Sequence, residues 1–108
     1  MTARIVRVWK GYGTAKGVDR YCCEHFSQTV LPQLRAVDGF LDANVLVRSS
    51  EGETKVIVAT VWDSIESIKA FAGENYEKAV VEPIVSHLLE RFDDDVTHYA
   101  VAVAAEDA

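Results

Sequence analysis

Apolar residues, many of them β-branched, fill or alternate along four stretches of the chain. These stretches are residues 3–10, 40–49, 55–62 and 96–103. Alternation places the apolar side chains on one face of an extended backbone, so the pattern predicts four β-strands. Residues 50–53 include Gly52 and separate the second stretch from the third, which predicts a β-hairpin at this point.

Apolar residues recur with helical spacing between the first two predicted strands. The members of this series are Val18, Cys22, Phe26 and Val30. An interval of four residues predicts a helix, which we expect to begin after Thr14 as its N-cap and to continue through Arg35. Pro32 has no N–H and should kink or break this helix. Gly39 follows Asp38 and should close the connection to the next strand.

A second helical region separates the third predicted strand from the fourth. Asp63 with Glu66 three residues later forms a capping-box pattern, so we expect Asp63 to be the N-cap of a helix that extends to about Phe71. The helical pattern is weaker at residues 72–75, and the pattern over residues 76–92 predicts a further helix that contains Pro83. Asp93-Asp94-Asp95 should form a solvated connection to the last strand.

The predicted order of elements is βαββαβ, with the second helical region broken. This order predicts an α+β fold of the ferredoxin-like type, in which a four-stranded antiparallel sheet carries its helices on one face. The chain has 108 residues, a length typical of one domain. We expect a single domain over residues 1–108, with its core at about 3–103 and a short C-terminal tail.

The face of the sheet that the helices leave uncovered would be in contact with water. In the third strand Val56, Val58, Thr60 and Trp62 point to one side, and Ile57, Ala59 and Val61 point to the other. Both faces are therefore apolar, and the uncovered one would expose roughly several hundred Å² of apolar surface. The chain has no spare segment to cover it. We therefore predict a homodimer in which two sheets pack face to face about a twofold axis.

Charge and composition narrow the classes of partner. The formal net charge is −6, so the chain is a poor candidate for binding nucleic acid. Arg4, Arg7 and Lys10 form a small basic cluster on the first strand, and we expect them to be solvated or paired with acids. No apolar run is long enough for a membrane span, and the N-terminus lacks the core of a signal peptide, which predicts a cytoplasmic protein without membrane partners.

Three side chains are candidates for a general base or hydrogen-bond donor. His25 lies on the apolar stripe of the first predicted helix, His98 lies in the last strand, and Tyr76 follows the loosened Gly73-Glu74-Asn75 stretch, which could form a lid at a pocket. Each could equally be a core residue whose polar group is hydrogen-bonded within the protein. The spacing of the histidines, which include His87, matches no metal motif, and adjacent Cys22 and Cys23 add none, so we expect no metal site.

Aromatic residues near the ends of the strands are candidates for the walls of a substrate pocket. Trp62, Trp9 and Phe71 could stack on an aromatic ligand, although each tryptophan could equally anchor the core. The sequence lacks the Gly-rich motifs of nucleotide-binding loops, so nucleotide-dependent chemistry has no support.

Three segments resemble one known family. They are the Val-Trp-Asp-Ser-x-Glu segment at residues 61–66, the Phe-Ala-Gly-Glu-Asn-Tyr segment at 71–76 and the Val-Thr-His-Tyr segment at 96–99. Together with the βαββαβ order, they resemble the antibiotic-biosynthesis-monooxygenase-like family of the dimeric α/β-barrel superfamily over about residues 3–103. The resemblance implies a homodimer that binds a small hydrophobic or aromatic ligand.

The resemblance also implies an activity. The sequence resembles cofactor-independent monooxygenases, which use O₂ on aromatic or polyketide-like substrates and line their pockets with an Asn and a Trp. Trp62 could match that Trp, and Asn44 is the nearest strand Asn. We therefore expect a monooxygenase without a cofactor, or alternatively a non-catalytic or stress-related homodimer that binds a small hydrophobic molecule.

Haem chemistry is the weakest expectation. The haem-degrading members of the superfamily use an Asn on the first strand and a Trp and a His in the second helical region. Here residues 5–9 contain no Asn, Phe71 stands where that Trp is expected, and His87 comes too late. Haem binding would need His25 or His87 as the axial ligand.

Overall fold

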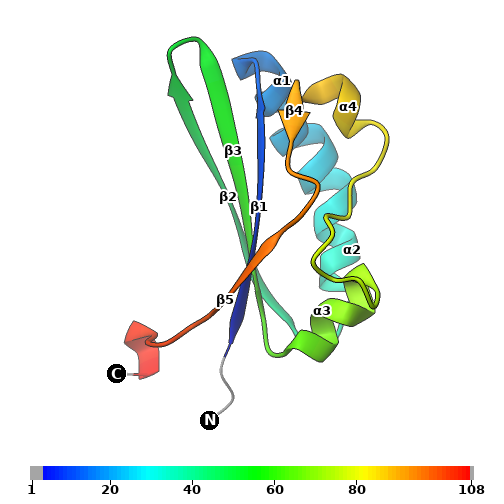
Figure 1. The fold of residues 1–108 in the computed structure, drawn as a ribbon, viewed down its shortest axis with the longest axis vertical. Helices are drawn as coiled ribbons and strands as arrows, with labels where there is room; N and C mark the ends of the chain where they lie inside the picture. Colours follow the sequence, from blue (N-terminus) through cyan, green and yellow to red (C-terminus); the bar gives the residue numbers. More distant parts are fainter. Residues whose placement is uncertain (1–3, 108) are drawn as a thin grey trace.

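The computed structural model describes residues 4–107, and in it the helices between residues 15 and 88 lie on one side of an antiparallel sheet (Figure 1). The strands are β1 (Ile5–Gly13), β2 (Phe40–Ser50), β3 (Glu53–Trp62), β4 (Arg91–Phe92) and β5 (Thr97–Ala100). Their spatial order is β2-β3-β1-β4, with β5 also paired to β1. This is the ferredoxin-like order, so the predicted α+β fold is confirmed.

The last predicted strand, over residues 96–103, is shorter than expected, and a second short strand precedes it. β4 pairs with Gly11 and Tyr12, and β5 pairs with residues 5–8 of the same strand β1. Asp93 donates its backbone N–H to the carbonyl of Lys10 at 3.0 Å between the two. The edge of the sheet is therefore one extended segment interrupted by the acidic residues 93–95, which gives five strands where the sequence predicts four.

β1 is longer than the sequence predicts, because Gly11 and Gly13 extend it and do not end it. Both glycines face the helices. A Cβ at Gly11 would lie 2.6 Å from Cδ1 of Leu89, and one at Gly13 would lie 3.4 Å from the backbone N of Glu90. An added Cβ at Gly11 would therefore displace the end of the Leu89 side chain, whereas at Gly13 it would make an ordinary van der Waals contact.

The hairpin between β2 and β3 is confirmed. Ser50 pairs with Glu53, which leaves Glu51 and Gly52 as a two-residue turn. Both have a positive φ, 51° at Glu51 and 80° at Gly52. This is the turn geometry that matches the twist of the two strands.

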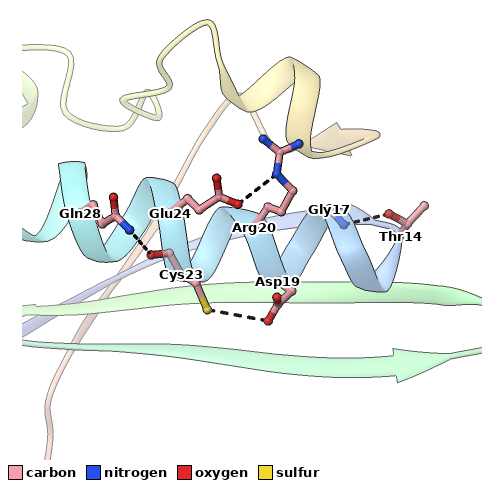
Figure 2. Close-up of polar contacts among 7 residues, drawn as sticks. All are labelled: Thr14, Gly17, Asp19, Arg20, Cys23, Glu24 and Gln28. Atoms are coloured by element: carbon pink, nitrogen blue, oxygen red, sulfur yellow. Dashed lines mark hydrogen bonds and ion pairs between the residues drawn. The ribbon is translucent and has the colours of Figure 1, made fainter.

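The first helix is continuous from residue 15 to residue 35 but changes its hydrogen-bond pattern twice. Its parts are α1 (Ala15–Arg20), the π-helical segment η1 (Tyr21–Val30) and α2 (Leu31–Arg35). The predicted N-cap is confirmed, since Thr14 Oγ1 accepts from the N–H of Gly17 at 3.0 Å (Figure 2). Pro32 lies where the π-helical pattern changes to the α-helical one, and the helix does not break there.

Polar contacts on the outer side of this helix connect successive turns (Figure 2). Arg20 pairs with Glu24 at 3.0 Å, and Gln28 Nε2 donates to the carbonyl of Cys23 at 3.3 Å. The second bond spans five residues, in keeping with the wider turns of a π-helix.

The second helical region differs from the prediction at both ends. The helix α3 spans Ile65–Ala72, and its N-cap is Ser64, which accepts from the N–H of Ser67 at 3.2 Å. Asp63 is one residue too early to be the cap. Its carboxylate accepts instead from the hydroxyls of Ser67 and Ser64, and these hydrogen bonds lower the pKa of Asp63.

The helix predicted over residues 76–92 is wrong. Only the short helix α4 (Val85–Leu88) forms there, and residues 73–84 run without regular structure over the helical side of the sheet (Figure 1). Their backbone groups bond to another segment: the N–H of Ala79 donates to Asp94 and the N–H of Val96 to Glu77, both at 2.8 Å. These bonds use backbone groups that a helix would need internally. The described chain ends in a 3₁₀ turn, η2 (Ala105–Asp107).

The two faces of the sheet are arranged as the alternation predicts. In β3 the side chains of residues 54, 56, 58, 60 and 62 are buried under the helices, and the intervening residues are half-buried on the other face. The uncovered face carries apolar side chains from three adjacent strands. They are Val6 and Val8 on β1, Ile57, Ala59 and Val61 on β3, and Leu46 on β2. We call this set the open apolar face.

Candidate functional site

A cavity of about 70 Å³ lies between the sheet and the helices. Strands β1 and β3 form its floor, η1 and α2 form one wall, and the irregular segment before α4 forms another. Its lining includes Arg7, Trp9, Tyr21, His25, Phe26, Val30, Gln33, Leu34, Val58, Thr60, Phe71, Val96 and residues 79–82 and 85. By this measure the space holds a few water molecules. The site is therefore mostly apolar, with a small number of polar groups.

His25 is the one of the three predicted bases that lines the cavity directly. It comes from η1, is 7% exposed, and its ring lies 5.6 Å from that of Tyr21. Its position on the apolar stripe of the helix is what the sequence predicts. A buried imidazole at an apolar cavity can accept a proton from a ligand bound there, provided that the ligand reaches it.

Arg7 also lines the cavity, and this overturns the expectation that it is solvated or paired with an acid. It is 5% exposed and faces the helices from β1. Nη1 donates to the carbonyl of Tyr76, and Nη2 donates to that of Lys78 at 3.0 Å. Burial lowers the pKa of Arg7 to about 10, so the guanidinium stays charged at neutral pH. No carboxylate among the described residues pairs with it.

Arg4 and Lys10, the other members of the predicted basic cluster, do not share this environment. Arg4 pairs with Glu106, as expected for a surface cation. The strand alternation contained the signal that sets Arg7 apart, because Arg7 and Trp9 are two residues apart and must share a face. A buried Trp9 therefore implies that Arg7 points inward.

His98 and Tyr76 lie behind Arg7 and not at the cavity surface. His98 pairs with Arg7 across β5 and β1, so its ring is on the helix side of the sheet. Its Nε2 lies 3.1 Å from Arg7 Nη1. A guanidinium can only donate, so Nε2 accepts and the ring proton is on Nδ1. The ring of Tyr76 packs edge-on against His98 with centroids 5.3 Å apart. Both residues thus position Arg7.

The pair of His98 and Arg7 predicts a pH dependence of stability. Burial, and next the charge of Arg7, lower the pKa of His98 below 6.5, the usual value of an imidazole. The stabilisation is therefore fully present above pH 6.5, and it is lost as the pH falls through the lower pKa of the folded state. We expect the free energy of unfolding in urea to decrease from pH 7 to pH 5. The His98→Gln variant, whose amide oxygen can still accept from Arg7, should show a shallower decrease. Identical slopes for the two proteins would contradict this prediction.

The predicted aromatic walls divide into two groups. Trp9 and Phe71 line the cavity, and Trp9 Nε1 donates to the carbonyl of Asp93 at 2.8 Å. Trp62 is outside the lining and fully buried, with Nε1 donating to Thr60 Oγ1 at 2.8 Å. Asn44 is exposed and lies opposite Ala59 on the open apolar face, on the far side of the sheet from the cavity.

Tyr21 lines the cavity and is not among the candidates predicted from the sequence. Its ring lies 5.7 Å from that of Trp9. Burial, with a smaller contribution from Cys22, raises the pKa of Tyr21 far above its usual range. The hydroxyl is therefore neutral at physiological pH and can donate a hydrogen bond to a ligand. The helical spacing could have indicated this position, because Tyr21 follows Val18 by three residues and lies on the apolar stripe of the helix.

The remaining candidates lie apart from the cavity. His87 is exposed on α4 and borders a shallow surface hollow beside Lys16 and Arg20. Within residues 4–107, no three side chains of the His, Cys, Asp and Glu types come together as metal ligands would. No helix in the same range is long and apolar enough to cross a membrane.

The sequence matches one family model. The model described as antibiotic biosynthesis monooxygenase matches residues 23–83, which is more than half of the chain. No curated protein matches the chain.

Several solved structures resemble this one along nearly their whole length. A putative antibiotic biosynthesis monooxygenase from Bacillus cereus is 19% identical with a TM-score of 0.63, over 94% of this chain and 96% of that one. A monooxygenase from Streptomyces coelicolor in complex with the ligand nanaomycin D is 20% identical with a TM-score of 0.63, over 95% and 90%. A haem degrader from Mycobacterium tuberculosis, with two haems bound in its active site, is 18% identical with a TM-score of 0.60, over 94% and 98%. At these identities the likeness establishes the fold.

Proposed function

The chain belongs to the antibiotic biosynthesis monooxygenase family, and from that premise we propose that it oxidises a small aromatic or polyketide-like substrate with O₂, without a cofactor. The observation that carries the proposal is the cavity between sheet and helices, where the imidazole of His25 faces a space enclosed by the aromatic residues Trp9 and Phe71. An apolar site with few polar groups suits a small aromatic ligand.

The proposed reaction uses the substrate itself as the source of electrons. His25 removes a proton from a phenolic or doubly activated C–H position, and the resulting carbanion transfers an electron to O₂. Recombination at that carbon and loss of water convert a CH₂ group into C=O, so that one oxygen atom enters the product and the other leaves as water. The four electrons lost by the carbon are the four that O₂ gains. The apolar walls exclude bulk water from the anion.

The size of the cavity limits the substrate. A volume of about 70 Å³ is too small for an aromatic ligand of one ring or more unless the lining side chains move. The segment of residues 73–84 has no regular structure and contributes four residues to the lining, so we infer that this segment moves to admit larger rings.

The proposed activity predicts a specific role for His25. The His25→Gln variant should consume O₂ at least about a hundredfold more slowly than the wild type, because it loses the general base. The measurement is O₂ uptake with a hydroxyanthrone, whose CH₂ group is the position that the proposed reaction oxidises. His87→Gln is the matched control, since His87 is exposed and away from the cavity, and its rate should equal that of the wild type. A wild-type rate equal to that in buffer would contradict the proposal.

A non-catalytic binding protein is the second candidate. The pattern of the working monooxygenases requires an Asn and a Trp in the pocket, whereas here Asn44 and Trp62 both lie outside the cavity lining. This placement favours binding without turnover. Retained ligand binding together with no acceleration of O₂ uptake would favour this alternative.

The residues of the cavity do not match a haem site. Strand β1 carries no Asn, and the ring of His25, the candidate axial ligand inside the cavity, packs against that of Tyr21 with centroids 5.6 Å apart. His87, the other axial candidate, is on the outer surface. We therefore derive no step through haem. A Soret shift on addition of haemin would overturn this reading.

We infer a homodimer through the open apolar face. Leu46 there is 52% exposed, and Tyr99, which lies beside Val6 at the edge of the same face, is 56% exposed. Soluble monomers rarely leave an apolar patch of this extent in water. A second copy offers a self-complementary cover, because the same face meets itself about a twofold axis.

A further inference from the structure

We propose that the cavity binds an aromatic carboxylate, with the carboxylate paired to the guanidinium of Arg7. This inference rests on the proposed function only to the extent that both use the same cavity. The site would thus select an anionic ligand over a neutral ligand of the same shape.

The first argument is the missing counter-charge. A charged group taken out of water is costly unless a partner of opposite charge or several hydrogen bonds replace the solvent. Arg7 is 5% exposed, and its protein partners are two backbone carbonyls and the neutral ring of His98. Within residues 4–107 no ion pair includes it. A buried cation in this state stabilises an anion that enters the cavity.

The second argument is the number of free donors. A guanidinium has five N–H groups, and the interactions with Tyr76, Lys78 and His98 occupy three of them. Nε–H and one N–H of Nη2 have no acceptor among the described residues. Nε and Nη2 are neighbouring nitrogens, and two neighbouring donors match the two oxygens of a carboxylate.

The third argument is the rigidity of the guanidinium. The carbonyls of Tyr76 and Lys78 and the ring of His98 together hold Nη1 and Nη2, so the group is oriented before a ligand arrives. The adjacent walls are apolar and aromatic, with Trp9 two residues away on the same face of β1. Such a site places a ring against the walls and a charge against Arg7. Glu82 is the acid among the lining residues, and it is not paired with Arg7.

The test compares two ligands of nearly equal shape and different charge. Binding of 4-fluorobenzoate and 4-fluorobenzamide is measured by ¹⁹F NMR titration at pH 7.5 on the full chain. We expect the wild type to bind the benzoate at least about tenfold more tightly, since charge-assisted hydrogen bonds are about twice as strong as neutral ones. Equal affinity for the two ligands, or binding of neither, would overturn the proposal without the use of any variant.

Variants assign the preference to Arg7. Arg7→Gln should bind both ligands equally, and Arg7→Lys, which keeps the charge but loses the paired donors, should retain part of the preference. Arg48→Gln is the matched control, because Arg48 is an exposed strand arginine on β2, and it should behave as the wild type. If Arg7→Gln does not fold, Arg7→Lys decides: a preference equal to that of the wild type would reject the paired geometry.

The outcome is separate from that of the O₂-uptake experiment. A benzoate preference without O₂ uptake supports an anion-binding protein and rejects the monooxygenase. O₂ uptake without a benzoate preference supports the proposed monooxygenase activity and rejects the proposed role of Arg7.

Discussion

Replacement of Trp62 by alanine is expected to lower the free energy of unfolding by about 3–5 kcal/mol, a large share of the stability of a small domain. Trp62 is 0% exposed at the end of β3. Its ring packs against Phe40 at 5.4 Å and against Phe71 at 5.7 Å between centroids. Truncation leaves a cavity that these neighbours can fill only in part, and it removes the donor that satisfies Thr60.

Urea unfolding at a fixed protein concentration measures this effect. Trp62→Phe should lose less stability than Trp62→Ala, because phenylalanine keeps most of the apolar volume. Val47→Ala is the control on the neighbouring strand, where the side chain is 53% exposed, and should cost less than about 0.5 kcal/mol. If Trp62→Ala kept the stability of the wild type and abolished ligand binding, the residue would be a pocket wall and not a core anchor.

Substitution of Ala59 by glutamate is expected to convert a dimer into a monomer. Ala59 lies near the middle of β3 on the open apolar face, opposite Val8 on one side and Asn44 on the other. In a face-to-face dimer each subunit would bury an added carboxylate among the apolar side chains of this face, which costs several kcal/mol. The dissociation constant should therefore rise by at least about a hundredfold.

Sedimentation equilibrium provides the measurement. The wild type should sediment at about twice the chain mass of 11.9 kDa, and Ala59→Glu at that mass itself. Val47→Glu adds the same charge to an exposed position on the other face of the sheet, and it should remain dimeric. A wild-type mass near that of one chain would reject the proposed dimer.

The sequence predicted the sheet better than the second helical region. β3 was predictable because residues 55–62 form a short continuous run rich in β-branched residues, which is typical of a strand. Residues 76–92 were predicted as a helix from their composition and spacing. They form mainly irregular structure because long-range partners, Asp94 and Arg7 among them, bond to backbone groups of that segment.

The candidate site was predicted in part. His25, Trp9 and Phe71 line the cavity, whereas Trp62 and Asn44 do not. Arg7 was missed because a charged residue in a strand is usually on the solvent side. Its inward position depends on the acceptors supplied by residues 76, 78 and 98, which are about 70 or more positions away in the chain.

The sequence by itself determined the order of the elements, the hairpin at Gly52, the Thr14 cap and the two apolar faces of β3. All of these depend on interactions between near neighbours or on the two-residue period of a strand. The tertiary structure alone decided that the edge strand is divided at residues 93–95, that residues 73–84 are irregular, and that Arg7 is a buried cation with no acidic partner among residues 4–107. These features depend on partners distant in the chain, whose positions only the packed fold determines.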